Sequence, residues 1–133
     1  MEPTTLFPII SILLLVTVEF GGWTLLGFLT EKDPPPRFRH NFFRAGHAHA
    51  GVLVTLALAY YLYLPRADYS HGIEWLCGVI LTIGILAQSG GFFMHAFVGR
   101  ENESSTGTLV TRLGAVLIAV ALVILAVGLI KTA

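Results

Sequence analysis

Two histidines and an arginine lie at the start of the second apolar stretch of the chain, within the sequence Arg-Ala-Gly-His-Ala-His-Ala-Gly at residues 44–51. Histidine side chains bind metals and transfer protons near neutral pH, and Arg44 adds a fixed positive charge. The alanines and glycines between them would leave a flat wall for a planar cofactor. Small residues also let membrane helices approach one another closely, so the pattern indicates either a cofactor site or a helix contact.

His47 and His49 point in different directions if this stretch is helical. Residues two apart on an α-helix diverge by about 200°, so the two side chains cannot bind one ion together. We expect His47 to face the bundle interior with Arg44 and Gly51, and His49 to face a cofactor, lipid or a neighbouring subunit. Histidine is a common axial ligand of haem iron. Beside His49 lies an apolar wall suited to a macrocycle, formed by Ala45, Gly46, Val52 and Leu53.

Glu19 is the acidic side chain placed deepest in an apolar stretch. It lies roughly 15 Å from the nearer helix end, at about 1.5 Å per residue. A carboxyl group at that depth must be protonated, paired or facing a wet cavity. Arg44, Arg112 or a histidine could pair with it. We therefore expect Glu19 to be buried inside the bundle, where it would act on a substrate or retain a cofactor.

Two further polar residues, Gln88 and His95, lie in the same half of the expected membrane layer as Glu19. Glu19, Thr55 or Gln88 could orient a substrate, so these three residues are the catalytic candidates. His95 stands near the end of the third apolar stretch and is either structural or part of a site. Polar side chains inside a membrane are costly unless they serve a function.

The composition predicts a membrane protein that forms one domain over residues 1–133. Hydrophobic residues make up 55% of the chain and charged residues only 12%, about half the charged fraction of soluble domains. A crossing helix needs about 20 apolar residues. Four stretches satisfy this condition, at roughly 5–29, 43–64, 73–98 and 107–130. Their short connections predict an all-α, up-down bundle of four transmembrane helices.

Charge and cysteine content exclude some classes and predict an orientation. The formal net charge is zero, so nothing indicates binding to nucleic acid, and the single cysteine, Cys77, rules out an intramolecular disulfide. Six of the eight Lys and Arg residues lie in or beside the first and third connections. The positive-inside rule places these connections in the cytoplasm. We expect a protein of the bacterial inner (cell) membrane with both termini outside, and Trp75 and tyrosines 60, 61, 63 and 69 in an aromatic belt at the outer interface.

The sequence Arg44–Gly51 resembles the Arg-Ala-His-Ser-Gly start of the second membrane helix in styrene oxide isomerase, a family of small four-span membrane proteins. That family binds haem b between neighbouring subunits of a trimer, and its ferric iron acts as a Lewis acid that converts an epoxide to an aldehyde. The resemblance implies a homo-oligomer, His49 as the iron ligand with Gly51 following it, and Arg44 near a haem propionate. His47 is the second candidate ligand.

The resemblance covers residues 44–51 and the topology. The family has an asparagine six positions after its ligand, where this chain has Thr55, and the family's active-site tyrosine has no counterpart among residues 88–91. These departures bear on the epoxide substrate more than on haem binding. The first functional hypothesis is therefore a haem b protein that isomerises a small lipophilic substrate or binds a small ligand.

Two other functions fit the same residues. One is a haem-free metal or acid–base enzyme that uses Glu19, His47 and His95 on a lipophilic substrate, since carboxyl and imidazole groups can move protons without a cofactor. The other is a non-catalytic subunit of a larger membrane complex, in which the polar residues form an interaction site. A visible absorption spectrum separates the haem hypothesis from both.

Overall fold

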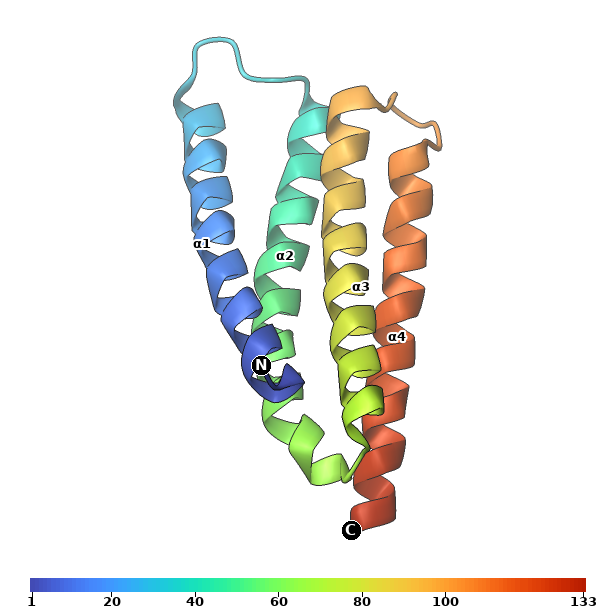
Figure 1. Cartoon of the computed structure of the whole chain (residues 1–133). Helices are drawn as coiled ribbons and strands as arrows, with labels where there is room; N and C mark the ends of the chain where they lie inside the picture. The colour runs from blue at the N-terminus through green and yellow to red at the C-terminus, as the bar shows by residue number, and fades with distance from the viewer.

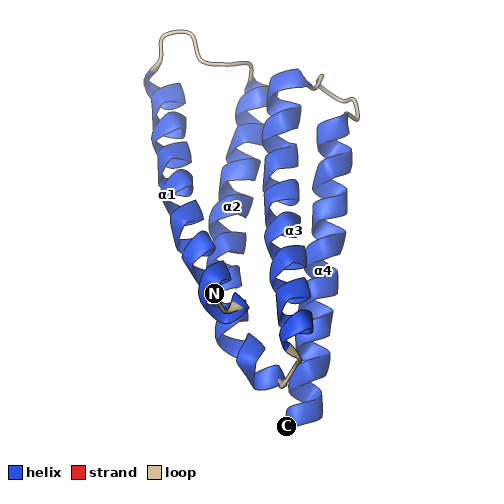
Figure 2. Cartoon of the chain, in the orientation of Figure 1, coloured by secondary structure: helices blue, strands red, loops and turns tan.

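The computed structural model describes residues 1–133 and contains four long helices and no strands (Figure 2). All four helices are long and apolar enough to cross a membrane, which confirms the predicted all-α class and the four spans. The helices are α1 (Pro3–Thr30), α2 (Arg37–Tyr63), α3 (His71–Val98) and α4 (Thr106–Thr132), and a short 3₁₀ helix, η1 (Leu64–Ala67), follows α2.

Local sequence signals explain where the helices begin and end. The prolines at 34–36 keep the first connection extended, and α2 begins directly after Pro36. It therefore starts six residues before the predicted position, because the charged segment 37–42 is helical although it is not apolar. Ser105 caps α4 by accepting a hydrogen bond from the Gly107 amide, and Thr108 completes a capping box. Such reciprocal caps satisfy amides that the first turn leaves free.

The helices pack in chain order, each antiparallel to the next (Figure 1). The closest packing joins α3 to α4, followed by α2 to α3 and α1 to α2, so that α1 and α4 occupy the outer positions. α1 diverges from α2 toward the 31–36 connection, while both chain termini lie at the opposite end (Figure 1). The array therefore has one loosely packed edge, α1, and one tightly packed edge, α4.

Glycines allow the close approach of α3 and α4. A Cβ atom on Gly91 would lie 2.5 Å from the Gly107 carbonyl oxygen, and one on Gly84 would lie 3.0 Å from the Ile118 backbone nitrogen. Gly114 likewise lies against the backbone of α3 at Gln88. Backbone-to-backbone contact of this kind is a main source of helix association in lipid, where the hydrophobic effect is absent between helices.

The buried core lies toward the end of the array that holds η1. Its members include Phe7, Tyr60, Tyr61, Cys77 and Leu81. The Tyr60 hydroxyl donates to the Ala121 carbonyl oxygen at 3.1 Å, and the Tyr61 hydroxyl to the Gly78 carbonyl oxygen at 3.3 Å. The expected aromatic belt is therefore wrong for these two tyrosines, which are buried and connect helices instead of lying at the membrane surface.

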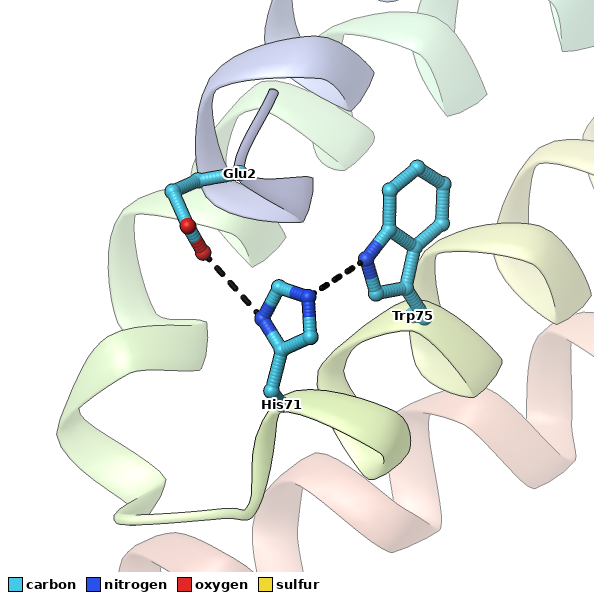
Figure 3. Close-up of polar contacts among 3 residues, drawn as sticks. All are labelled: Glu2, His71 and Trp75. Atoms are coloured by element: carbon cyan, nitrogen blue, oxygen red, sulfur yellow. Dashed lines mark hydrogen bonds and ion pairs between the residues drawn. The ribbon is translucent and has the colours of Figure 1, made fainter.

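Hydrogen bonds at the surface connect the start of α1 to α3. The Glu2 carboxylate lies 3.1 Å from His71 Nδ1, and the Trp75 indole N–H donates to His71 Nε2 at 3.0 Å (Figure 3). An indole nitrogen can only donate, so Nε2 carries no proton in this arrangement. His71 is then neutral and donates its Nδ1 proton to Glu2. Both ends of the Glu2–His71 pair are more than half exposed.

Candidate functional site

His49 lies on α2 at the border between the contact with α3 and the exposed face of the array. Its ring stacks on Phe92 of α3 with 4.7 Å between ring centroids. Its Nδ1 atom lies 2.8 Å from the carbonyl oxygen of Ala45, one turn earlier in the same helix. Because a carbonyl oxygen can only accept, Nδ1 carries the proton and Nε2 holds a lone pair.

The Nε2 atom of His49 has no hydrogen-bond partner in the chain. Beside it, Ala48, His49, Val52 and Leu53 line an open hollow of about 190 Å³. A histidine whose Nδ1–H is held by a backbone carbonyl is the tautomer that binds metals through Nε2. The site therefore combines an available metal-binding nitrogen, a fixed ring orientation and an apolar surrounding.

His47 faces the opposite side of α2, as the divergence of 200° predicts. Its ring lies against α1, where a Cβ atom on Gly21 would be 3.0 Å from His47 Nδ1. This Nδ1 atom is buried and has no hydrogen-bond partner. The two glycines at 21 and 22 make room for the ring, so His47 serves as part of the contact between α1 and α2.

Arg44 and Gly51 lie on the same side of α2 as His47. Gly51 is in contact with Val18 of α1, and Arg44 lines a hollow of about 260 Å³ with Leu25, Leu29 and His40. Positions five apart on a helix diverge by about 140°, so Arg44 points away from His49. The expectation that Arg44 and Gly51 border a group bound to His49 is thus not met within one chain.

Glu19 is exposed on α1, which corrects the expectation that it is buried in the bundle. It makes no ion pair, since the one carboxylate in contact with a basic side chain is that of Glu2, which accepts a hydrogen bond from the neutral His71 ring. Its position follows from the rotation of α1, whose few fully buried side chains lie on another face of the helix.

The three catalytic candidates lie on three helices and make no hydrogen bond with one another. Thr55 is exposed on α2 and donates its hydroxyl proton to the Gly51 carbonyl oxygen at 2.8 Å. Gln88 is half-buried on α3, where its backbone faces Gly114 of α4. Glu19 lies on the outer face of α1.

His95 has a structural role in the connection between α3 and α4. It is 1% exposed, its ring lies 4.1 Å from that of Phe42, and its Nδ1 atom is 2.7 Å from the hydroxyl oxygen of Ser105. Ser105 is the residue that caps α4, so His95 holds this cap in place. No three His, Cys, Asp or Glu side chains lie close enough to hold a metal ion together, which rules out the expected three-residue site formed by Glu19, His47 and His95.

A cavity of about 180 Å³ lies between α1, α2 and α3 near the middle of the helices. Most of its lining is apolar, and its polar side chains are Thr17 and Ser89. Ser89 is 5% exposed, and its hydroxyl has no hydrogen-bond partner. Sequence reasoning selected the neighbouring Gln88 and missed Thr17. A period of 3.6 residues counted from Gly78, Leu81 and Ile85 places Gln88 and Ser89 at equal angles from the inner face, so periodicity alone does not separate them.

Comparisons of the chain with models of known protein families, with curated proteins and with solved structures each find no match. The functional argument therefore depends on the site itself and on the short resemblance at residues 44–51.

Proposed function

We propose that the protein binds haem b in the membrane, with His49 as the axial ligand of the iron. The observation that carries this proposal is the Nδ1–H bond from His49 to the Ala45 carbonyl oxygen, which leaves Nε2 free beside an apolar hollow. His47 is the weaker candidate because its ring is enclosed against α1 at Gly21.

Several residues of the chain have defined tasks in this proposal. The Ala45 carbonyl fixes the tautomer and raises the basicity of the His49 ring. Phe92 holds the plane of the ring by stacking, at 4.7 Å between centroids. Val52 and Leu53 present an apolar surface beside the ligand nitrogen. A flat apolar surface of this kind suits the face of a macrocycle and keeps water from the iron.

A bound ferric haem would supply a Lewis acid for an oxygen atom of a substrate, the chemistry that the resemblance to styrene oxide isomerase implies. We propose an isomerase that converts an epoxide, or a similar small lipophilic compound, to a carbonyl compound. Such an isomerisation is redox-neutral and needs no second substrate. The apolar lining at Ala48 and Val52 favours an uncharged substrate that reaches the site from the bilayer.

Haem content and the visible spectrum test the proposal directly. Protein purified from cells supplied with haem should show a Soret band, and His49→Ala should lose both the band and the bound haem. His47→Ala is the matched control, two residues away on the same helix, and should keep its haem. Loss of haem in His47→Ala but not in His49→Ala would exchange the two roles, and a haem-free wild-type protein would refute the proposal.

We further propose that the connections at 31–36 and 99–105 face the cytoplasm of a bacterium and that both termini lie outside. The support is the excess of Lys and Arg beside these two connections. Labelling Ser104→Cys and Ser70→Cys in sealed vesicles with a membrane-impermeant maleimide tests the orientation. Ser70→Cys should react from the outer side, and reaction of Ser104→Cys from that side would reverse the assignment.

A further inference from the structure

Two oppositely charged residues face outward from the two outer helices of the array. Glu19 is exposed on α1, and Arg112 is exposed on α4. Neither forms an ion pair or a side-chain hydrogen bond, because the one contact between an acidic and a basic side chain joins Glu2 to the neutral His71 ring at the surface. An exposed face of a crossing helix meets lipid, where a charge without a partner is costly.

The contacts between helices show which residues lie at the same membrane depth. On α1 and α2, Gly21 lies against His47 and Val18 lies against Gly51. Since the two helices are antiparallel, position 19 lies opposite position 50. Gly46 of α2 lies against Phe92 of α3, so position 50 lies opposite positions 88–91.

The contacts of α3 with α4 extend this alignment across the array. Gly91 lies against Thr111, and Gly114 lies against Gln88. Positions 88–91 are therefore opposite positions 111–114, which include Arg112. Glu19 and Arg112 thus lie at the same depth to within a helical turn, on helices that α2 and α3 keep apart.

We propose that a second copy of this chain pairs the two charges, with Glu19 of one copy bound to Arg112 of the next. All copies of a membrane protein share one orientation, so a rotation about the membrane normal preserves the depth of every residue. The α1 edge of one copy can then lie beside the α4 edge of its neighbour with the carboxylate and the guanidinium at one level. This pairing is favourable because both oxygens of a carboxylate can accept hydrogen bonds from one guanidinium group.

The contact is head-to-tail, since it uses two different surfaces of each copy. A repeated head-to-tail contact closes into a ring when the rotation between neighbours allows it. Every junction of such a ring pairs one Glu19 with one Arg112, so that neither of these two charges faces lipid without a partner. Among the exposed arginines of α2, Arg44 lies nearest to this level, but it fits less well, because position 44 lies opposite position 25 of α1, about 9 Å nearer to the connections at 1.5 Å per residue.

Disulfide cross-linking tests the contact without removing either charge. Val16 of α1 and Val116 of α4 are both exposed, and each lies one turn from the charged residue, on the side away from the 31–36 connection. The double variant Val16→Cys/Val116→Cys should form covalent multimers on mild oxidation in native membranes. The control Val16→Cys/Val127→Cys should stay monomeric, because position 127 is exposed but lies about 18 Å from the level of position 16.

Exchange of the two charges supplies a second, independent measurement. Glu19→Arg and Arg112→Glu should each abolish the cross-link and the oligomer in lipid nanodiscs, because each places like charges together at every junction. The double variant Glu19→Arg/Arg112→Glu should restore both. Wild-type protein that is monomeric in nanodiscs would overturn the proposal, as would single exchanges that leave the oligomer intact. A cross-link between the cysteines at 16 and 116 that forms only when another protein or a particular lipid headgroup is present would also overturn it. Haem content is measured separately, so its loss or retention does not affect this result.

Discussion

The contact between α3 and α4 predicts opposite effects for the same substitution at two adjacent glycines. Gly91 lies against α4, where an added Cβ atom would be 2.5 Å from the Gly107 carbonyl oxygen and 2.5 Å from the Thr111 backbone nitrogen. Gly90 lies next to it on α3, and a Cβ atom there would meet nothing within 4 Å. The two variants Gly91→Ala and Gly90→Ala thus add one methyl group each, one into a backbone contact and one into open space.

The size of the effect follows from the distances. Ordinary van der Waals contact of a Cβ atom begins at 3.4 Å, so the Gly107 carbonyl must retreat by 0.9 Å. Backbone cannot yield as a side chain can, and overpacking of this kind costs about 1–3 kcal/mol. The helix propensity of alanine exceeds that of glycine by about 1 kcal/mol, but both variants gain this stabilisation equally. Their difference in free energy of unfolding should therefore be about 1–3 kcal/mol, with Gly91→Ala the less stable.

Reversible unfolding in mixed micelles, followed by tryptophan fluorescence, measures this difference. Each variant is compared with wild type under the same conditions and with the same fraction of denaturing detergent. Equal stabilities of Gly90→Ala and Gly91→Ala would refute the close contact of α3 with α4 at this level. A more stable Gly91→Ala would show that the helices lie further apart than the glycine pattern requires.

Three smaller predictions use the same unfolding assay. Tyr60→Phe removes the hydroxyl that donates to the Ala121 carbonyl oxygen and should lower the free energy of unfolding by about 1 kcal/mol; an unchanged value would mean that water or lipid replaces the bond. His95→Ala removes a buried ring and the bond to Ser105, so we expect a loss of roughly 2 kcal/mol or more with normal haem content; loss of haem without loss of stability would instead make His95 a ligand. His71→Ala should change the stability by less than about 1 kcal/mol, because its hydrogen bond to Glu2 is mostly exposed to solvent, and a larger loss would show that the contact is shielded in the membrane.

The number and approximate limits of the helices could be predicted because crossing helices need long apolar stretches. The start of α2 could not, since the segment from Arg37 to Phe42 is helical but carries charge. The divergence of His47 and His49 was also predictable, because it depends only on the geometry of one helix. Their neighbours, Gly21 and Phe92, required the packing of three helices.

The directions of Glu19 and Gln88 could not be derived from the pattern of apolar residues. In a soluble bundle, the polar face of a helix shows which side meets water. A membrane helix is apolar on the lipid side as well as on the packed side, so its rotation about its own axis leaves little trace in composition. Glu19 was therefore assigned to the interior, whereas α1 turns it outward. Gly91 and Gly114 lie on the packed side, whereas the adjacent Gly90 faces open space, so small residues alone do not fix the rotation of a helix either.

Because α1 lies at the edge of the array, the chain can be divided into two polypeptides, α1 and the three remaining helices. The α2–α4 unit keeps the glycine contacts of α3 with α4 and the hydroxyl bond from Tyr60 to Ala121 without any help from α1. α1 contributes the Phe7 ring, which fills the space beside Gly78 on α3. The same ring packs edge-on against Trp75, with 5.4 Å between ring centroids. A cut in the proline-rich connection at 34–36 would thus leave two pieces with matching surfaces. Synthesised separately, α1 and the segment that holds α2, α3 and α4 should associate in the bilayer, with Phe7 determining where α1 binds.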